Sequence, residues 1–354
     1  MEELDRAFLE GAVLLDRTGS EAVLEVRGDD ASDYLQRMLS CDLRKLTGDP
    51  DRGQGSLGVL MTGKGRLIAP FMVHRMTETG RDGESENCAS FWFLLESSVL
   101  DGFEAALERL VILEDVSFFR PKVAILSVQG PGADAALLGE SVGGEPLPGK
   151  EGERVRLELG GGAHAWVVNR PRCLFGGWDF VVPIDLRDSL AAGILERGAI
   201  ECADESAVER HRILAAIPRF GVDGTEANLP PEAGYDAGIA YDKGCYAGQE
   251  VVARIRTYGH VNRRLCALNL LGSSVPPVAA KIRTLPVEGE EEGKVVGEIT
   301  SATLDPRSGC AVALGFVRYK KAVLDQPLEI VGVGRATITA VIGTPTEKTN
   351  STEA

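Results

Sequence analysis

The chain is organised around residues 242–265, which read DKGCYAGQEVVARIRTYGHVNRRL. The first part of this stretch places one thiol, Cys245, between Gly244 and Gly248. Glycine tolerates backbone angles that other residues avoid. The spacing therefore predicts a tight loop that holds Cys245 at a bend rather than inside a helix or strand.

The residues after this loop predict a helix. Gln249 and Glu250 stand in its first turn, and Arg254 follows Glu250 by four residues, so the two can pair on one face. A thiol just before a helix start and two residues from Lys243 lies in positive potential, which favours the thiolate. Cys245 is therefore a candidate reactive group. The spacing is equally compatible with a small buried thiol that packs under a turn.

Length and composition indicate a soluble protein of several domains. A chain of 354 residues predicts two or three domains, and 44% hydrophobic residues is ordinary for a globular protein. No apolar run approaches the roughly 18 residues of a membrane span. The acidic start, MEELDRAF, has neither a signal nor a transit pattern, so we expect no membrane contact and a cytoplasmic location.

The charge is uneven along the chain. A formal net charge of −15 argues against direct nucleic-acid binding. Within residues 243–264, however, Glu250 is the one acid against five basic residues: Lys243, Arg254, Arg256, Arg263 and Arg264. This local excess suggests an anionic ligand or a phosphate docking site. The alternative is a set of solvated arginines paired with acids elsewhere in the fold.

The seven cysteines, at positions 41, 88, 173, 202, 245, 266 and 310, form no CxxC pair, and no histidine stands beside one at metal-ligand spacing. This pattern disfavours a metal site, a disulfide framework and a resident iron–sulfur cluster. Reduced thiols of a cytosolic protein are the expectation.

Lys243 to Glu250 resembles the K-G-C-Y-x-G-Q-E signature of the YgfZ family, the folate-binding branch related to the glycine cleavage T-protein. Flanking segments resemble the same family in the same order. They are DDASDYLQ and LMTGKGR early in the chain, IPRFGVDGTEANLPPEAGYD before the signature, and VGEITS and ALGFVR after it. The resemblance covers nearly the whole chain.

The fold expected from these patterns is α+β. Strand, glycine turn and helix occur twice, near Gly28 and Gly130, and short alternating runs between 266 and 342 predict a small barrel. The resemblance implies two ferredoxin-like lobes and a C-terminal antiparallel β-barrel in a cloverleaf around a central channel. We expect a first lobe at 1–120 completed by 205–262, a second lobe at 121–204, a barrel at 263–345 and a disordered tail at 346–354.

The resemblance also implies a function. It implies tetrahydrofolate as the cofactor, and a role in assembling or repairing iron–sulfur enzymes, including those that methylthiolate tRNA. The partners would be such client enzymes or cluster-assembly proteins. Cys245 would be the key thiol and Lys243 would favour its thiolate. The predicted ligand contacts are Tyr246, Gln249, Arg254, Asp179 and Glu232.

The sequence departs from the T-protein branch at two places. That branch has paired aspartates where this chain has Ala69 and Pro70, and neither residue can exchange a proton. Its T-G-E-D-G stretch is also lost, and Asp179 is the nearest remaining acid. A folate-dependent aminomethyl- or methyltransferase and a non-catalytic scaffold therefore stay open as alternatives, and the sequence does not decide whether the protein is an enzyme.

Overall fold

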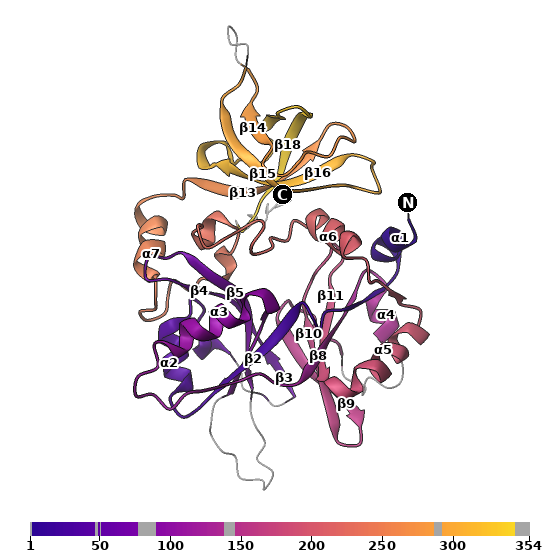
Figure 1. Ribbon diagram of the computed structural model, residues 1–354, viewed down its shortest axis with the longest axis vertical. Coiled ribbons are helices and arrows are strands. Elements are labelled where there is room, and N and C mark those ends of the chain that lie inside the picture. Colours follow the sequence, from indigo (N-terminus) through magenta and orange to yellow (C-terminus); the bar gives the residue numbers. More distant parts are fainter. Residues whose placement is uncertain are drawn as a thin grey trace, which may run out of the picture.

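The computed structural model describes residues 2–46, 49, 51–76, 90–137, 146–286 and 292–343. Two β-sheets that pack against each other form one end of the molecule, and a β-barrel forms the other end (Figure 1). The segment that carries α6 (Glu205–Leu214) and α7 (Gln249–Tyr258) runs between them.

The first sheet is antiparallel and has the order β4-β5-β6-β2-β7. Its strands are β2 (Glu21–Arg27), β4 (Ser56–Met61), β5 (Leu67–Met76), β6 (Ser90–Glu96) and β7 (Ser117–Phe119). Helices α2 (Ala31–Met38) and α3 (Ser97–Glu108) cover one face, where Phe71, Phe93 and Phe103 pack with ring centroids 5.2–5.4 Å apart. These aromatic contacts add to the stabilisation that burial itself supplies.

The second sheet has the order β12-β1-β8-β11-β10-β9-β3. Its strands are β1 (Val13–Asp16), β3 (Arg52–Gln54), β8 (Val123–Gln129), β9 (Glu153–Gly160), β10 (Ala163–Asn169), β11 (Gly177–Pro183) and β12 (Ile200–Glu201). Helices α4 (Ala133–Leu137) and α5 (Arg187–Glu196) cover its outer face. Because β1 and β3 come from the first 60 residues, the N-terminal segment contributes to both sheets. The domain boundaries expected from the sequence stay a prediction.

The two sheets pack face to face. Their inner faces share one apolar layer, in which Val23, Met72 and Leu94 of the first sheet meet Ile125 and Trp166 of the second. The order of layers is therefore helices, sheet, sheet, helices. Each sheet buries both of its faces, which explains why their strands are apolar on both sides.

The barrel is closed and antiparallel, with strands in the order β13-β16-β15-β14-β17-β18. They are β13 (Arg263–Leu270), β14 (Lys281–Thr284), β15 (Val295–Leu304), β16 (Ala311–Arg318), β17 (Pro327–Ile330) and β18 (Gly334–Val341). Closure removes every strand edge. The predicted α+β fold with a C-terminal antiparallel barrel is confirmed, whereas the predicted tail at 346–354 lies outside the described residues.

The signature stretch joins the first sheet to the barrel. Tyr246 and Val252 are buried in a core that also holds Met61 of β4, Leu265 of β13 and Phe316 of β16. The remaining helices are α1 (Glu3–Glu10) and the short turns η1 (Leu43–Lys45), η2 (Ile184–Leu186), η3 (Pro230–Glu232), η4 (Asp236–Gly238) and η5 (Tyr319–Lys321). Among the described residues, no helix is both long and apolar enough to cross a membrane.

Candidate functional site

A cavity of about 330 Å³ opens where the two sheets and the loops before the signature meet. Strands β4, β5 and β6 supply one side, and residues 151, 170–171, 216–218, 234–235 and 237–238 supply the other. Leu57, Val59, Pro70, Met72 and Ile217 make its walls mainly apolar. A mainly apolar cleft or cavity with a few polar groups is the usual form of a small-molecule site.

Four polar residues line this cavity and can orient a ligand: Glu96, Glu151, Arg170 and Tyr235. The Tyr235 hydroxyl is buried and has no hydrogen-bond partner among the described residues. Burial raises the pKa of Tyr235, and the charge of Glu96 adds to this shift. Burial also raises the pKa of Glu96, with a contribution from the Glu21 carboxylate. A buried polar group normally finds a partner, so the Tyr235 hydroxyl indicates a ligand site.

Arg170 is held in place by a buried ionic network that links the two sheets. Glu21, at the start of β2, accepts from Arg170 at 2.8 Å and from Arg172 at 2.7 Å. Asp179 of β11 accepts from Arg172 at 3.0 and 2.6 Å and from Arg170 at 3.4 Å. Burial opposes ionisation of Glu21, but the two arginines outweigh it and lower the pKa of Glu21 to about 2.

Asp179 was predicted to contact the ligand, but in the structure it belongs to this ionic network. The Asp179 side chain is fully buried and both of its oxygens accept from arginines, so it lies behind the wall of the cavity. Glu96 is the carboxylate that lines the cavity near Tyr235. The prediction from the sequence did not include Glu96. An acid at the end of the apolar strand FWFLLE could have marked it as a candidate site residue.

The signature loop has the predicted turn at Gly248. The contacts of Lys243 differ from those predicted. Gly248 has φ 81°, and α7 begins directly after it, as predicted. The Lys243 ammonium donates to the main-chain carbonyls of Leu39 at 2.8 Å and Cys41 at 2.6 Å. Burial lowers the pKa of Lys243 to about 8. Lys243 thus ties the signature to the segment after α2, and its described hydrogen bonds do not involve the Cys245 thiol.

Cys245 is exposed, and Tyr246 beside it is buried under the Lys243 ammonium, which lies 5.1 Å from the ring centroid. Burial raises the pKa of Tyr246 to about 12. The Gln249 side chain accepts from the Tyr246 main-chain nitrogen at 3.3 Å, which closes the loop onto the helix. Arg254 is exposed on α7.

Glu232 has a local structural contact. Its buried carboxylate accepts from the Asn228 side chain at 3.3 Å and from the Leu229 main chain at 3.2 Å, so it closes the turn at η3. None of the predicted site residues lines the central cavity within the described chain. The structure brings Lys243, Tyr246 and Gln249 together and leaves Asp179 and Glu232 in other parts of the fold.

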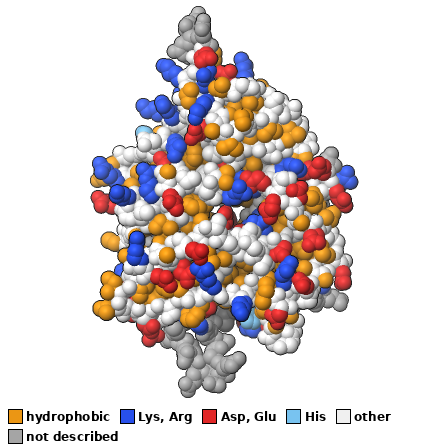
Figure 2. Space-filling view, in the orientation of Figure 1, with side chains coloured by type: hydrophobic (Ala, Val, Ile, Leu, Met, Phe, Trp, Pro, Cys, Tyr) orange, Lys and Arg blue, Asp and Glu red, His pale blue; other side chains and the backbone are white. Residues whose placement is uncertain are grey.

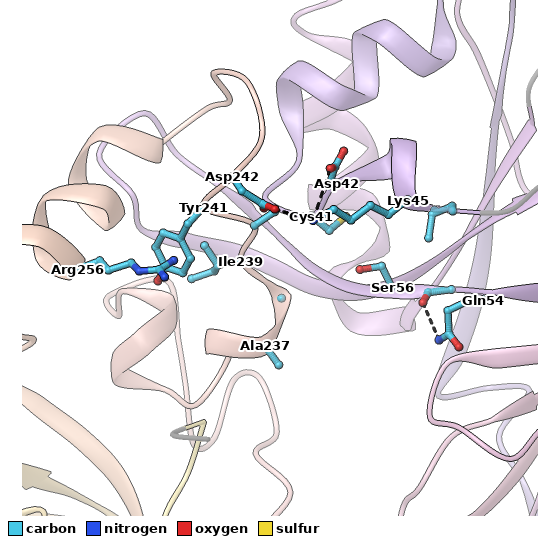
Figure 3. Close-up of a pocket in the computed structure, with 14 residues that line it drawn as sticks. Cys41, Asp42, Lys45, Gln54, Ser56, Ala237, Ile239, Tyr241, Asp242 and Arg256 are labelled. Carbon is cyan, nitrogen blue, oxygen red and sulfur yellow. Dashed lines mark hydrogen bonds and ion pairs between the residues drawn. The ribbon is translucent and has the colours of Figure 1, made fainter. Parts of the chain in front are cut away.

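A second cleft, of about 530 Å³, adjoins the signature (Figure 3). The Lys45 ammonium and the Asp242 carboxylate form an ion pair at 2.8 Å across it, and the Arg256 guanidinium lies 4.1 Å from the centre of the Tyr241 ring. Burial raises the pKa of the Cys41 thiol in this cleft to about 12, so it stays protonated at neutral pH.

Strand β5 places the two residues that replace the paired aspartates, Ala69 and Pro70, on opposite faces of its sheet. Ala69 points into the core on the helix side of the sheet, whereas Pro70 lines the central cavity. The cavity therefore has no carboxylate at the Pro70 position.

No family model matches the chain. It is 26% identical over 327 residues to an aminomethyltransferase of Nostoc sp., covering 90% of this chain and 81% of that protein. It is 24% identical over 241 residues to the tRNA-modifying protein YgfZ of Vibrio atlanticus, covering 67% of this chain and 63% of the relative. The crystal structure of the glycine cleavage system aminomethyltransferase T from Bartonella henselae matches 97% of this chain with 89% of its own, at a TM-score of 0.78 and 18% identity.

The chain therefore has the fold of the glycine cleavage T-protein, with a cavity between its first sheet and the loops that face it. Its homologues include aminomethyltransferases and a YgfZ protein, so the chain is similar to both of these branches. The resemblance drawn from the signature is confirmed.

Proposed function

We propose that this protein binds tetrahydrofolate in the central cavity and supports the assembly or repair of iron–sulfur enzymes in the cytoplasm, with Cys245 as its working thiol. The observation that carries the binding part is the buried, unpartnered hydroxyl of Tyr235 beside Glu96 in an apolar cavity. The six cysteines in the described chain are free thiols, which fits a reducing compartment.

The residues of the cavity fit a folate. The amino-pyrimidine edge of a pterin donates two parallel hydrogen bonds, and a carboxylate such as Glu96 can accept both. The Tyr235 hydroxyl can donate to a ring nitrogen or carbonyl oxygen, and the apolar walls can cover the ring faces. Arg170, fixed by Glu21, supplies a positive charge for an anionic part of the ligand.

Two features argue against one-carbon transfer as the function of the bound folate. Pro70 cannot exchange a proton with a folate amine, and the exposed Cys245 stands outside the cavity. We therefore propose that folate is bound without being consumed, while Cys245 meets a partner at the surface. The relative named a tRNA-modifying protein supports a client that modifies tRNA.

The second candidate is a folate-dependent aminomethyltransferase. The raised pKa of Glu96 favours it, because a carboxyl group that titrates nearer to neutral pH can act as a general acid or base. The relatives named aminomethyltransferases favour it as well. Folate-dependent turnover of an aminomethyl donor by the purified protein, lost in Glu96→Gln, would place this candidate first.

Folate binding is tested by calorimetric titration of the purified protein with tetrahydrofolate. Loss of a hydrogen bond to a charged group costs about 1.5–3 kcal/mol, so Glu96→Gln should weaken binding about 10- to 100-fold. Tyr235→Phe should weaken it less, and Tyr258→Phe, at an exposed ring, should have no effect. Wild-type protein that does not bind tetrahydrofolate would refute the proposal.

The thiol is tested separately. Cys245→Ser should bind tetrahydrofolate like wild type, yet fail to restore tRNA methylthiolation in cells that lack the protein. The buried Cys266→Ser provides the matched control for loss of a thiol. Full restoration by Cys245→Ser would remove the thiol from the proposal and leave folate binding untouched.

A further inference from the structure

Five basic side chains are carried by α7, by the start of β13, by the end of β16 and by the turn η5 that follows it. We call this surface the basic stripe and define it as Arg254, Arg256, Arg263, Arg318 and Lys320. All are exposed except the half-buried Arg263. Figure 2 shows Lys and Arg side chains along the left edge of the molecule, from α7 upward to the barrel. The stripe is a local exception on a chain whose net charge is −15.

These cations do not contribute ion pairs to the fold. None of the ion pairs within the described residues involves a member of the stripe, and Glu250 makes none with Arg254 although it stands four residues earlier. Arg263 and Arg318 stand directly opposite each other on β13 and β16. Like charges in that position destabilise a sheet. The Arg263 guanidinium lies 4.3 Å from the centre of the Phe316 ring, whereas Arg318 is exposed, so packing accounts for Arg263 but not for Arg318.

Aromatic rings lie among these cations. The Tyr258 side chain, at the end of α7, is 86% exposed and Tyr319 is 40% exposed. The His260 ring stacks on Tyr319 with centroids 4.0 Å apart and an interplanar angle of 5°. A cavity of about 740 Å³ opens beside this stack, and Arg256 and Arg264 also line it.

Exposed rings beside arginines that form no ion pair within the described residues match the chemistry of a single-stranded nucleic acid. Guanidinium groups bind phosphates along the backbone, and aromatic faces stack on bases. An acidic peptide would use the arginines but leave the rings without a role. At physiological ionic strength, salt screens the field of an exposed charge beyond about 8 Å. Acidic residues farther away than this therefore do not cancel the positive potential of the basic stripe.

We infer that the basic stripe binds a short single-stranded RNA segment, with its phosphates along Arg254, Arg318 and Lys320 and a base in the cavity beside Tyr319. The relative named a tRNA-modifying protein favours RNA over DNA. This inference differs from the expectation based on net charge and is independent of folate binding, since the stripe and the central cavity share no residue.

The test is fluorescence anisotropy of the full-length protein with a labelled oligouridine of about twelve nucleotides, a length within the range that one binding module covers. The double variant Arg254→Glu with Arg318→Glu should weaken binding at least tenfold. It should also reduce the slope of log affinity against log salt by about 1.4, since each lost phosphate contact removes about 0.7. Tyr258→Ala with Tyr319→Ala should weaken binding about tenfold and leave that slope unchanged.

The matched control is Arg109→Glu with Lys150→Glu, which makes the same change in net charge at exposed positions away from α7. It should bind like wild type. Equal weakening by this control would overturn the assignment of the surface, as would wild-type protein that does not bind the oligouridine. Binding of a glutamate-rich peptide in place of RNA would assign the stripe to an acidic protein instead, and equal affinity for DNA of the same sequence would overturn the choice of RNA.

Discussion

Replacing Glu21 with glutamine should destabilise the protein by removing the central acid of the network that joins the two sheets. Glu21 accepts from Arg170 at 2.8 Å and from Arg172 at 2.7 Å, and both bonds cross from β2 to the loop before β11. Glutamine keeps the size of the side chain and removes its charge. The substitution leaves Asp179 as the one carboxylate that pairs with Arg172. A buried cation that loses one of its two anionic partners lowers the free energy of unfolding.

The expected magnitude follows from the pKa. The pKa of Glu21 falls from 4.5 in the unfolded chain to about 2 in the folded protein, and each unit is worth about 1.36 kcal/mol. The ionised carboxylate therefore contributes roughly 3 kcal/mol to the free energy of unfolding at pH 7. A carboxyl group with a lowered pKa gives its full contribution above pH 4.5 and loses it as the pH falls toward 2. About half should remain at pH 3.

Urea unfolding followed by tryptophan fluorescence measures this difference. The three tryptophans, Trp92, Trp166 and Trp178, lie on the two sheets that the network joins. Glu21→Gln should lose roughly 3 kcal/mol at pH 7, and the gap to wild type should narrow at pH 3. Glu25→Gln, on the same strand with a hydrogen bond from Ser90, is the control and should lose less than about 1 kcal/mol. A loss in Glu21→Gln below that level, or one as large at pH 3 as at pH 7, would contradict the reasoning.

Two further predictions concern the signature loop. Gly248→Ala should destabilise the protein by about 1–3 kcal/mol, because φ is 81° and a Cβ would lie 2.7 Å from the Thr62 carbonyl oxygen, whereas Gly244→Ala, in open space, should stay within about 0.5 kcal/mol by thermal unfolding. Amine labelling as a function of pH should reach half its maximum near pH 8 for Lys243, below the ordinary lysine value of about 10.4. Since a lowered lysine pKa penalises the folded state below it, wild type should also gain stability between pH 8 and 10.5, and Lys243→Met should not. If Lys243 is labelled only near pH 10, its ammonium is not buried where it would donate to the carbonyls of Leu39 and Cys41.

Local patterns in the sequence were sufficient for the elements and for the kinship. The glycine at 248 predicts the turn before α7 because few other residues reach a φ of 81° without strain, and the helix follows its predicted residues. The alternating runs after residue 266 predict the barrel because strands repeat every two residues. The order of family-like segments predicts the T-protein fold, and the structural match confirms it.

The candidate sites depend on contacts that spacing does not encode. Glu96 and Tyr235 come from β6 and from the loop before the signature, and they line one cavity only because the sheets pack there. Lys243 donates to Leu39 and Cys41, more than 200 positions earlier in the chain, so its neighbour Cys245 is not the partner that proximity in sequence suggested. Backbone preferences are local, whereas burial, pairing and pKa depend on which distant side chains share a volume. The amino-acid sequence alone therefore determined the elements and the likeness to the T-protein fold, and the tertiary structure decided which side chains form a site.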